Sequence, residues 1–260
     1  MTVPTSGGRK PSRITFMKAV LAIAGIALFL AFISLGTWQV QRRAWKLDLI
    51  ERVNQRVHSQ PVAVPAQAQW PNVQPDSHEY LAVQAQGQWL EGRSVLTQAV
   101  SDLGAGFWLL TPLQQADGTQ VLVNRGFVPT EQRKAFADQI AQAPKDAAGD
   151  AVTVTGLLRF SEPKGGFMRE NAPEADRWHS RDVAAIAQTK GLEQAAPFFV
   201  DQGIPGQAAP ATWPRPGLTV IKFTNTHAVY ALTWYGLALM VLVAAWLVIH
   251  YERRKAATAP

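Results

Sequence analysis

The sequence predicts an α+β membrane protein, in which two transmembrane helices, one near each terminus, flank a mainly antiparallel β domain. Two apolar segments, Ala19–Gly36 and Ala228–Ile249, are each close to the roughly 20 residues that cross a ~30 Å hydrocarbon core. About 190 residues lie between them, enough for one domain with its own core. Short runs of strand character with close turns favour a barrel-like or sandwich-like domain with short helices.

These segments divide the chain into five parts. We expect a basic tail at 1–18, a first transmembrane helix at 19–37, a β-rich domain at 38–226, a second transmembrane helix at 227–249 and a basic tail at 250–260. The first apolar run exceeds the 7–15-residue core of a signal peptide, so we expect it to remain as an anchor.

The excess charge lies in the two tails. Four basic residues and no acid precede the first apolar segment, and three basic residues and one acid follow the second, whereas 18 basic and 18 acidic residues lie between. Because tails rich in Lys and Arg favour the cytoplasm, we expect an inner-membrane protein with both termini cytoplasmic and the central domain periplasmic. Basic residues directly after the first segment oppose this orientation, but long domains translocate largely regardless of charge. The central domain has no net charge and therefore no excess of positive charge that would bind nucleic acid. The basic tails can contact anionic lipid at the surface of a bilayer.

The central region alternates between strand and turn signals, with Asp117-Gly118 as the best hairpin signal. Strands are expected at Tyr80–Leu90, Ser94–Val100, Phe107–Leu113, Gln120–Val128, Val152–Phe160, Phe198–Asp201 and Leu218–Phe223. Two helices are expected at Glu131–Gln142 and from Arg181-Asp182 to Lys190. The first membrane helix should continue to Val57 along an amphipathic stripe.

Small residues along both spans predict that the two helices pack together, because small side chains let helix backbones approach closely. They are Ala24, Ala27, Ala31 and Ser34 in the first span, and Ala231, Ala238 and Ala245 in the second. Polar residues ahead of the second span can cap its helix; they are Thr224, Asn225 and Thr226.

The chain offers no sign of catalysis. It has no cysteine, which excludes disulfides, thiolate metal sites and cysteine nucleophiles. Serine-hydrolase, zinc-protease and phosphate-loop motifs are also absent. We therefore expect no catalytic residues and a non-enzymatic role.

One ionisable residue, His227, opens the second span. An ionisable side chain at the edge of a membrane segment is a functional candidate, and neutral imidazole is a good axial ligand for haem iron. Tyr230 and Trp234 follow at i+3 and i+7, so that one helix face presents a histidine over two aromatic rings. Alternatively, His227 simply begins the helix and the rings belong to the aromatic belt at the membrane interface.

A second candidate surface follows the first span. Trp38, Arg42 and Trp45 fall on one helix face at i, i+4 and i+7. Arg42 could pair with a haem propionate, because a guanidinium matches a carboxylate with two parallel hydrogen bonds. An interfacial aromatic belt with a snorkelling arginine would give the same pattern.

Four segments, in this order between two terminal spans, resemble the surfeit locus protein 1 family of cytochrome c oxidase assembly proteins. They are LGTWQVQR (35–42) leading to WK (45–46), VNRGFVP (123–129), WHSRD (178–182), and NTH (225–227) with YALTWYG (230–236). The similarity covers nearly the whole chain, and the family shares the two-span topology.

The resemblance implies a role in assembling the haem-containing subunit I of a terminal oxidase. It implies haem a as cofactor, with His227 as the iron ligand, and it implies subunit I, other assembly factors and haem a synthase as partners. The alternative within the same family is a scaffold that stabilises nascent subunit I without touching haem.

Overall fold

The computed structural model describes residues 13–145, 151–163, 169–208, 210–221 and 223–258. The chain divides into two compact units. The first comprises Met1–Ile50 with Phe223–Pro260, and the second is Glu51–Lys222. We call them the helix unit and the barrel unit and describe each by itself.

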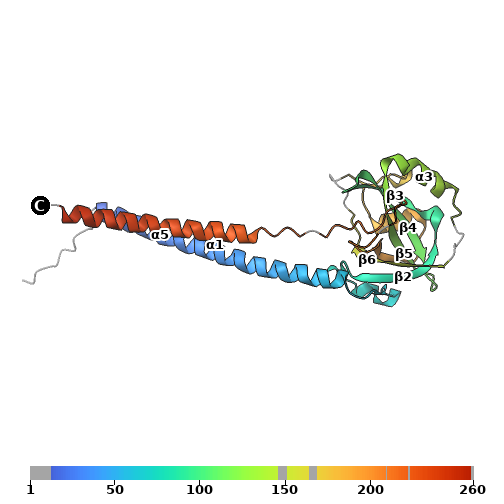
Figure 1. Cartoon of the computed structure of the whole chain (residues 1–260), viewed down its shortest axis with the longest axis horizontal. Helices are drawn as coiled ribbons and strands as arrows, with labels where there is room; N and C mark the ends of the chain where they lie inside the picture. Colours follow the sequence, from blue (N-terminus) through green and yellow to red (C-terminus); the bar gives the residue numbers. More distant parts are fainter. Residues whose placement is uncertain (1–12, 146–150, 164–168, 209, 222, 259–260) are drawn as a thin grey trace, which may run out of the picture. The chain divides into compact units, whose positions relative to one another are not determined.

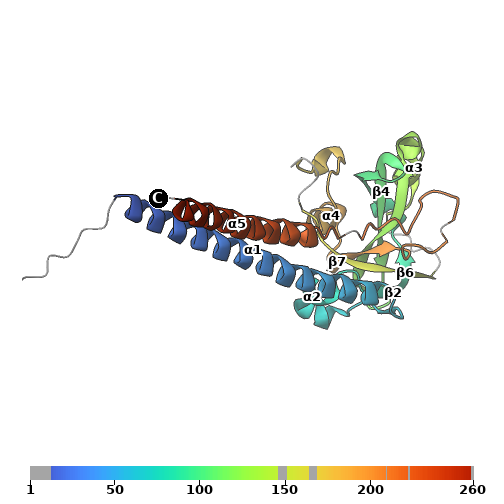
Figure 2. The same cartoon turned by 60° about the vertical axis from the view of Figure 1, so that its left-hand side comes forward.

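The helix unit is built on two long helices, both long and apolar enough to cross a membrane. They are α1 (Arg13–Val57), whose last turns belong to the barrel unit, and α5 (His227–Ala257). The helices run side by side and antiparallel (Figures 1 and 2). Lys18 and Glu252 form an ion pair of 2.8 Å near one end of the pair, while Gln39 and His227 are bonded near the other. The predicted mutual packing is therefore confirmed.

The contact between the helices follows a spacing of four and three residues, which is typical of left-handed helix packing. On α5 it centres on Ala231 and Ala238, both nearly fully buried as predicted, whereas Ala245, the third residue of the predicted stripe, is exposed. On α1 the prediction was wrong, because Ala24, Ala27, Ala31 and Ser34 are exposed. The contact face of α1 instead carries Phe29, Phe32, Gly36 and Gln39. Larger side chains on α1 fill the space that the alanines of α5 leave.

The barrel unit is a closed five-stranded barrel (Figure 1). Its strands are β2 (Ala82–Trp89), β4 (Gly104–Gln114), β5 (Gln120–Pro129), β6 (Ala151–Phe160) and β7 (Ala195–Gln202). The order is β2-β6-β7-β5-β4, and a short β2–β4 pairing closes the ring. All neighbours are antiparallel except the third and fifth barrel strands, β5 and β7. This is the Greek-key connectivity of the OB barrel.

The other elements of this unit surround the barrel. The strands are β1 (Val62–Ala63), parallel to β2, and β3 (Val95–Ser101), which forms a hairpin with β4. The helices are η1 (Gln67–Asn72), α2 (Pro75–His78), η2 (Glu91–Arg93), η3 (Thr130–Gln132), α3 (Arg133–Gln142), η5 (Pro173–Ala175) and α4 (Val183–Lys190).

The core has two layers, because β5 and β7 are buried on both faces. One layer fills the barrel and receives Val121 and Val123 of β5 and Phe198 of β7. The other layer receives the alternate residues Leu122 and Phe199 and lies outside the barrel, under α4 and Trp178. Strands buried on both faces read as continuous apolar runs, as in LLT and VLV of β4 and β5.

The predicted strands and both predicted helices are present, with one exception. Residues 218–221 and Phe223 form no strand; Lys222 lies outside the described residues. The apolar alternation was misleading here because a closed barrel leaves no free edge on β5 or β7 for another strand. Helix α5 does begin after Thr226, but the Thr226 side chain makes no capping hydrogen bond.

Candidate functional site

His227 lies at the first position of α5 and contacts α1. Its Nδ1 lies 2.7 Å from Oε1 of Gln39, whose side chain is only 9% exposed. A carboxamide oxygen only accepts hydrogen bonds, so this contact places the proton of neutral His227 on Nδ1. Gln39 therefore fixes the orientation and the tautomer of the imidazole.

The other ring nitrogen of His227 is available. Nε2 has no hydrogen-bond partner among the described residues, and it is not fully buried. With Nδ1 protonated, Nε2 carries the lone pair. A metal-ligating histidine usually donates its other N–H to an oxygen in this way, which orients the ring and raises its basicity.

A second polar group two residues away has no partner. Oδ1 of Asn225 is buried and makes no hydrogen bond. Buried polar atoms are nearly always paired, so an exception calls for an explanation such as a ligand or an ordered water. In sequence, Asn225 is only a capping candidate and Gln39 was not predicted as a site residue. A glutamine just after an apolar segment, three residues beyond Gly36, was the signal that could have found it.

The two aromatic residues that follow His227 on α5, Tyr230 and Trp234, differ in burial. Trp234 is half-buried and stacks on Phe32 of α1, with ring centroids 5.8 Å apart. Tyr230 is 54% exposed. The structure therefore brings His227 and Trp234 to the contact with α1, whereas Tyr230 faces outward.

Arg42 and Trp38 lie on exposed faces of α1. The guanidinium of Arg42 stacks over the ring of Trp45 at 4.0 Å from its centroid, and Trp38 is 54% exposed. Arg42 makes no ion pair with a described carboxylate, so its hydrogen-bond donors remain available. No hydrogen bond or ring contact among the described residues links Arg42 or Trp38 to His227.

The segment VNRGFVP (123–129) has a structural role in the barrel unit. Asn124 donates to Asp201 and accepts from the Gly126 N–H, and Arg125 pairs with Glu91 while stacking on Trp89. Gly126 has φ +134°, opposite a register shift in β4, and a Cβ there would overlap the carbonyl of Arg215. Asn124, Arg125 and Gly126 are thus engaged in contacts that hold the fold.

A buried ionic cluster completes this part of the barrel. Asp201 accepts hydrogen bonds from Asn124, Arg159, Arg181 and Thr219. Burial alone would lower the pKa of Arg159, but the negative charge of Asp201, with Tyr80 and Glu79, outweighs it and raises that pKa above its ordinary value. Arg159 thus stays charged at any physiological pH, and the cluster is a permanent ion-pair network.

No group of three His, Asp or Glu side chains able to hold a metal occurs among the residues that the structure describes. At the start of α5, His227 offers one ring nitrogen as a ligand. That donor set does not suit a bare metal ion held by side chains alone. It fits a metal that arrives already bound in a macrocycle, as in haem.

The fold and this site define a class: proteins with two apolar helices that flank a β-barrel domain and carry a single accessible histidine at the start of the second helix. Residues 26–239 match the SURF1 family, and the chain belongs to it. It is similar to Surfeit locus protein 1 of Homo sapiens, with 32% identity over 241 residues that cover 86% of this chain and 74% of the relative. The mouse protein of the same name is 33% identical over 219 residues (78% and 67%). A SURF1-like protein of Monosiga brevicollis is 32% identical over 239 residues (85% and 83%).

Proposed function

We propose that this chain is an assembly factor for cytochrome c oxidase that holds haem a and aids its insertion into subunit I, without catalysing a reaction. Membership of the SURF1 family supports the assembly role. The observation that carries the haem role is the accessible Nε2 of His227, with Nδ1 fixed on Gln39. A bound haem would supply an iron that accepts one imidazole nitrogen.

The residues around His227 have complementary roles in this proposal. Gln39 holds the imidazole in one tautomer, and Asn225 offers an unpaired oxygen to a polar substituent of the ring system. Tyr230, Trp234 and Trp38 offer aromatic surface at the membrane interface. Arg42 offers a guanidinium for a propionate.

The proposed setting follows the charge of the tails. The chain lies in the inner membrane with both termini in the cytoplasm, so that His227 and the barrel unit are periplasmic. Its proposed partners are oxidase subunit I, other oxidase assembly factors, haem a synthase and the surrounding lipid.

A second candidate function is a scaffold that stabilises nascent subunit I without binding haem. One observation favours it: Trp234 already stacks on Phe32, so part of the aromatic face next to His227 is occupied by the protein itself.

A visible absorption spectrum separates the two functions. The full-length protein would be purified in detergent from cells that make haem a. A Soret band and haem a bands that remain through gel filtration support the carrier. Colourless protein, together with a loss of subunit I in cells that lack the gene, supports the scaffold. Colourless protein and normal amounts of oxidase without the gene would overturn both.

A further inference from the structure

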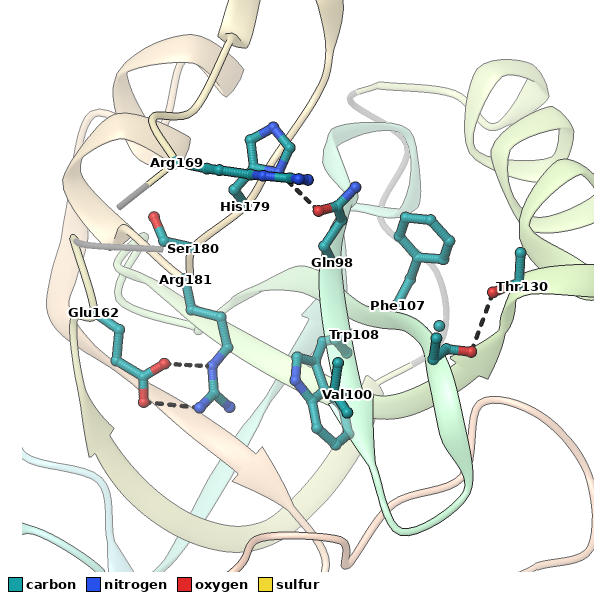
Figure 3. A pocket seen from close by; sticks show the side chains of 13 residues that line it. Gln98, Val100, Phe107, Trp108, Thr130, Glu162, Arg169, His179, Ser180 and Arg181 are labelled. Carbon is teal, nitrogen blue, oxygen red and sulfur yellow. Dashed lines mark hydrogen bonds and ion pairs between the residues drawn. The ribbon is translucent and has the colours of Figure 1, made fainter. Parts of the chain in front are cut away.

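A pocket of about 660 Å³ lies on the outer wall of the barrel unit, between the β3–β4 hairpin and the β6–β7 connection (Figure 3). OB barrels bind their ligands on the face of the second and third strands, with the connections that follow the first and fourth. In this barrel those connections contain β3 and the WHSRD segment (178–182). The proposed function gives neither a role.

The WHSRD segment is built into the pocket wall by a set of hydrogen bonds. The side-chain oxygen of Asn171 accepts the N–H groups of His179 and Ser180. Trp178 is buried, and its carbonyl accepts the Gln98 N–H of β3 at 2.9 Å. The side chains of His179, Ser180 and Arg181 therefore line the pocket from a fixed backbone.

The edge of β3 that faces away from β4 is free beyond Gln98. Backbone groups of alternate residues in an antiparallel strand point to the same edge. Since the Gln98 N–H points away from β4, the N–H and C=O of Val100 do so as well. Val100 lines the pocket, is 85% exposed and makes no backbone hydrogen bond to any described residue outside the β3–β4 ladder. A free edge of this kind accepts an added strand.

The pocket has aromatic walls and surplus positive charge. Phe107 and Trp108 supply the aromatic surface, and the Trp108 ring lies next to Val100 in Figure 3. The one carboxylate in the lining, Glu162, is paired with Arg159 and Arg181. Arg169 is exposed at the rim and forms no hydrogen bond or ion pair with any described residue. An incoming carboxylate would find this guanidinium unneutralised.

We propose that the pocket binds an extended, acidic peptide segment of a partner protein. The segment pairs with the backbone of Val100, packs on Phe107 and Trp108, and places a carboxylate on Arg169. The inference rests on the proposed function only in the identity of the partner, which would be an oxidase subunit. The free strand edge and the unpaired arginine stand without it.

Photo-crosslinking in the intact membrane tests the proposal. The photoreactive amino acid p-benzoylphenylalanine would replace Val100 in the full-length chain, with the exposed Val62 as the control position. We expect a crosslink at position 100 and not at 62, and mass spectrometry should map it to a segment with acidic residues. A synthetic peptide of that segment would then be titrated against the purified protein.

Two substitutions decide how such a peptide binds. Val100→Pro removes the N–H from the free edge without removing a ladder bond, and Arg169→Glu reverses the rim charge; each should weaken binding at least tenfold. Val100→Thr and Lys134→Glu, which changes an exposed cation outside the pocket, should leave binding unchanged. Equal crosslinking at both positions, a crosslink to lipid or to a segment without acids, or binding that Arg169→Glu does not affect would overturn the proposal. A mapped acidic segment from a protein outside the oxidase would support the pocket and count against the proposed function.

Discussion

The ionic cluster around Asp201 in the barrel unit and the polar groups at the start of α5 in the helix unit differ in how far their hydrogen bonds are satisfied. In the barrel, Asp201 accepts hydrogen bonds from four side chains, and Asn124 uses both ends of its amide. In the helix unit, His227 uses one of two ring nitrogens, and Asn225 leaves its buried oxygen unpaired. A saturated cluster specifies a fold, because each member has its partners within the chain. An unsaturated one retains the capacity to bind something else.

This contrast predicts that substitutions in the barrel motif remove the protein itself. Gly126→Glu should give the largest effect of all, with little folded chain in the membrane. The φ of +134° strains any other residue, and a Cβ overlaps the backbone of Arg215. Abundance on an immunoblot and the melting temperature in detergent measure it. Gly104→Ala is the matched control: its φ is +101°, but nothing lies within 4 Å of the added Cβ. Normal abundance of Gly126→Glu with lost function would mean that this motif is an interaction surface.

Substitution in the ionic cluster around Asp201 should destabilise the protein almost as strongly. Asp201→Ala removes the most buried carboxylate that Arg159 and Arg181 share and leaves Glu162 to pair with both. Removing one member of a buried ion pair costs about 3–5 kcal/mol. Because the pKa of Arg159 is raised, its favourable contribution is present below its unfolded-state pKa and is lost only as the pH rises through the higher folded-state value. The loss in Asp201→Ala should therefore be the same throughout the neutral pH range. A loss that changes across that range would contradict a permanent network.

The helix pair should tolerate small changes except where Gly36 meets the side chain of Tyr235. A Cβ on Gly36 would lie 2.6 Å from the ring of Tyr235, so Gly36→Leu should push the helices apart at a cost of about 1–3 kcal/mol. Gly25→Leu is the control, since a Cβ there meets nothing within 4 Å. The chain has no cysteine, so disulfide formation between cysteines introduced at Phe32 and Trp234 reports the packing directly. Unchanged crosslinking in Gly36→Leu would show that Gly36 is not a contact residue.

The smallest predicted effect is that of Gln39→Ala, next to His227. Gln39→Ala removes the hydrogen bond that orients the His227 ring. Loss of such a partner typically lowers metal affinity ten- to hundredfold. Titration with haem, followed by absorption, measures the affinity. Gln41→Ala, at an exposed position two residues along the same helix, should have no effect. Equal affinities for the two variants would remove the positioning role of Gln39.

Much of the fold was predictable from the sequence because period-two alternation and turn residues encode strands locally. The six strands from β2 to β7, both long apolar helices and the helix capped by Asp182 follow from such local patterns. The failures are non-local. The apolar run after Leu218 looks like a strand, but closure of the barrel leaves it no edge. The alanines of the first span look like a contact face. The face of α1 that is buried, which carries Phe32 and Gly36, is set by how α1 packs against α5 and not by local sequence.

The candidate site was predictable only in part for the same reason. His227 stands out in sequence because it is ionisable and begins an apolar helix. Its partner Gln39 lies 188 residues away, so no local pattern joins them. The pocket on the barrel likewise needs β3 and the WHSRD segment, which become neighbours only in the folded chain.

The absorption spectrum of purified His227→Ala protein, compared with that of the unaltered chain, tests whether His227 ligates haem iron. We expect a haem a spectrum from the unaltered chain and little or none from His227→Ala. Helix content by circular dichroism should be unchanged, because alanine is a good helix former. His250→Ala, at the other end of α5, should keep the full spectrum. A His227→Ala protein that retains its full haem spectrum would contradict the account.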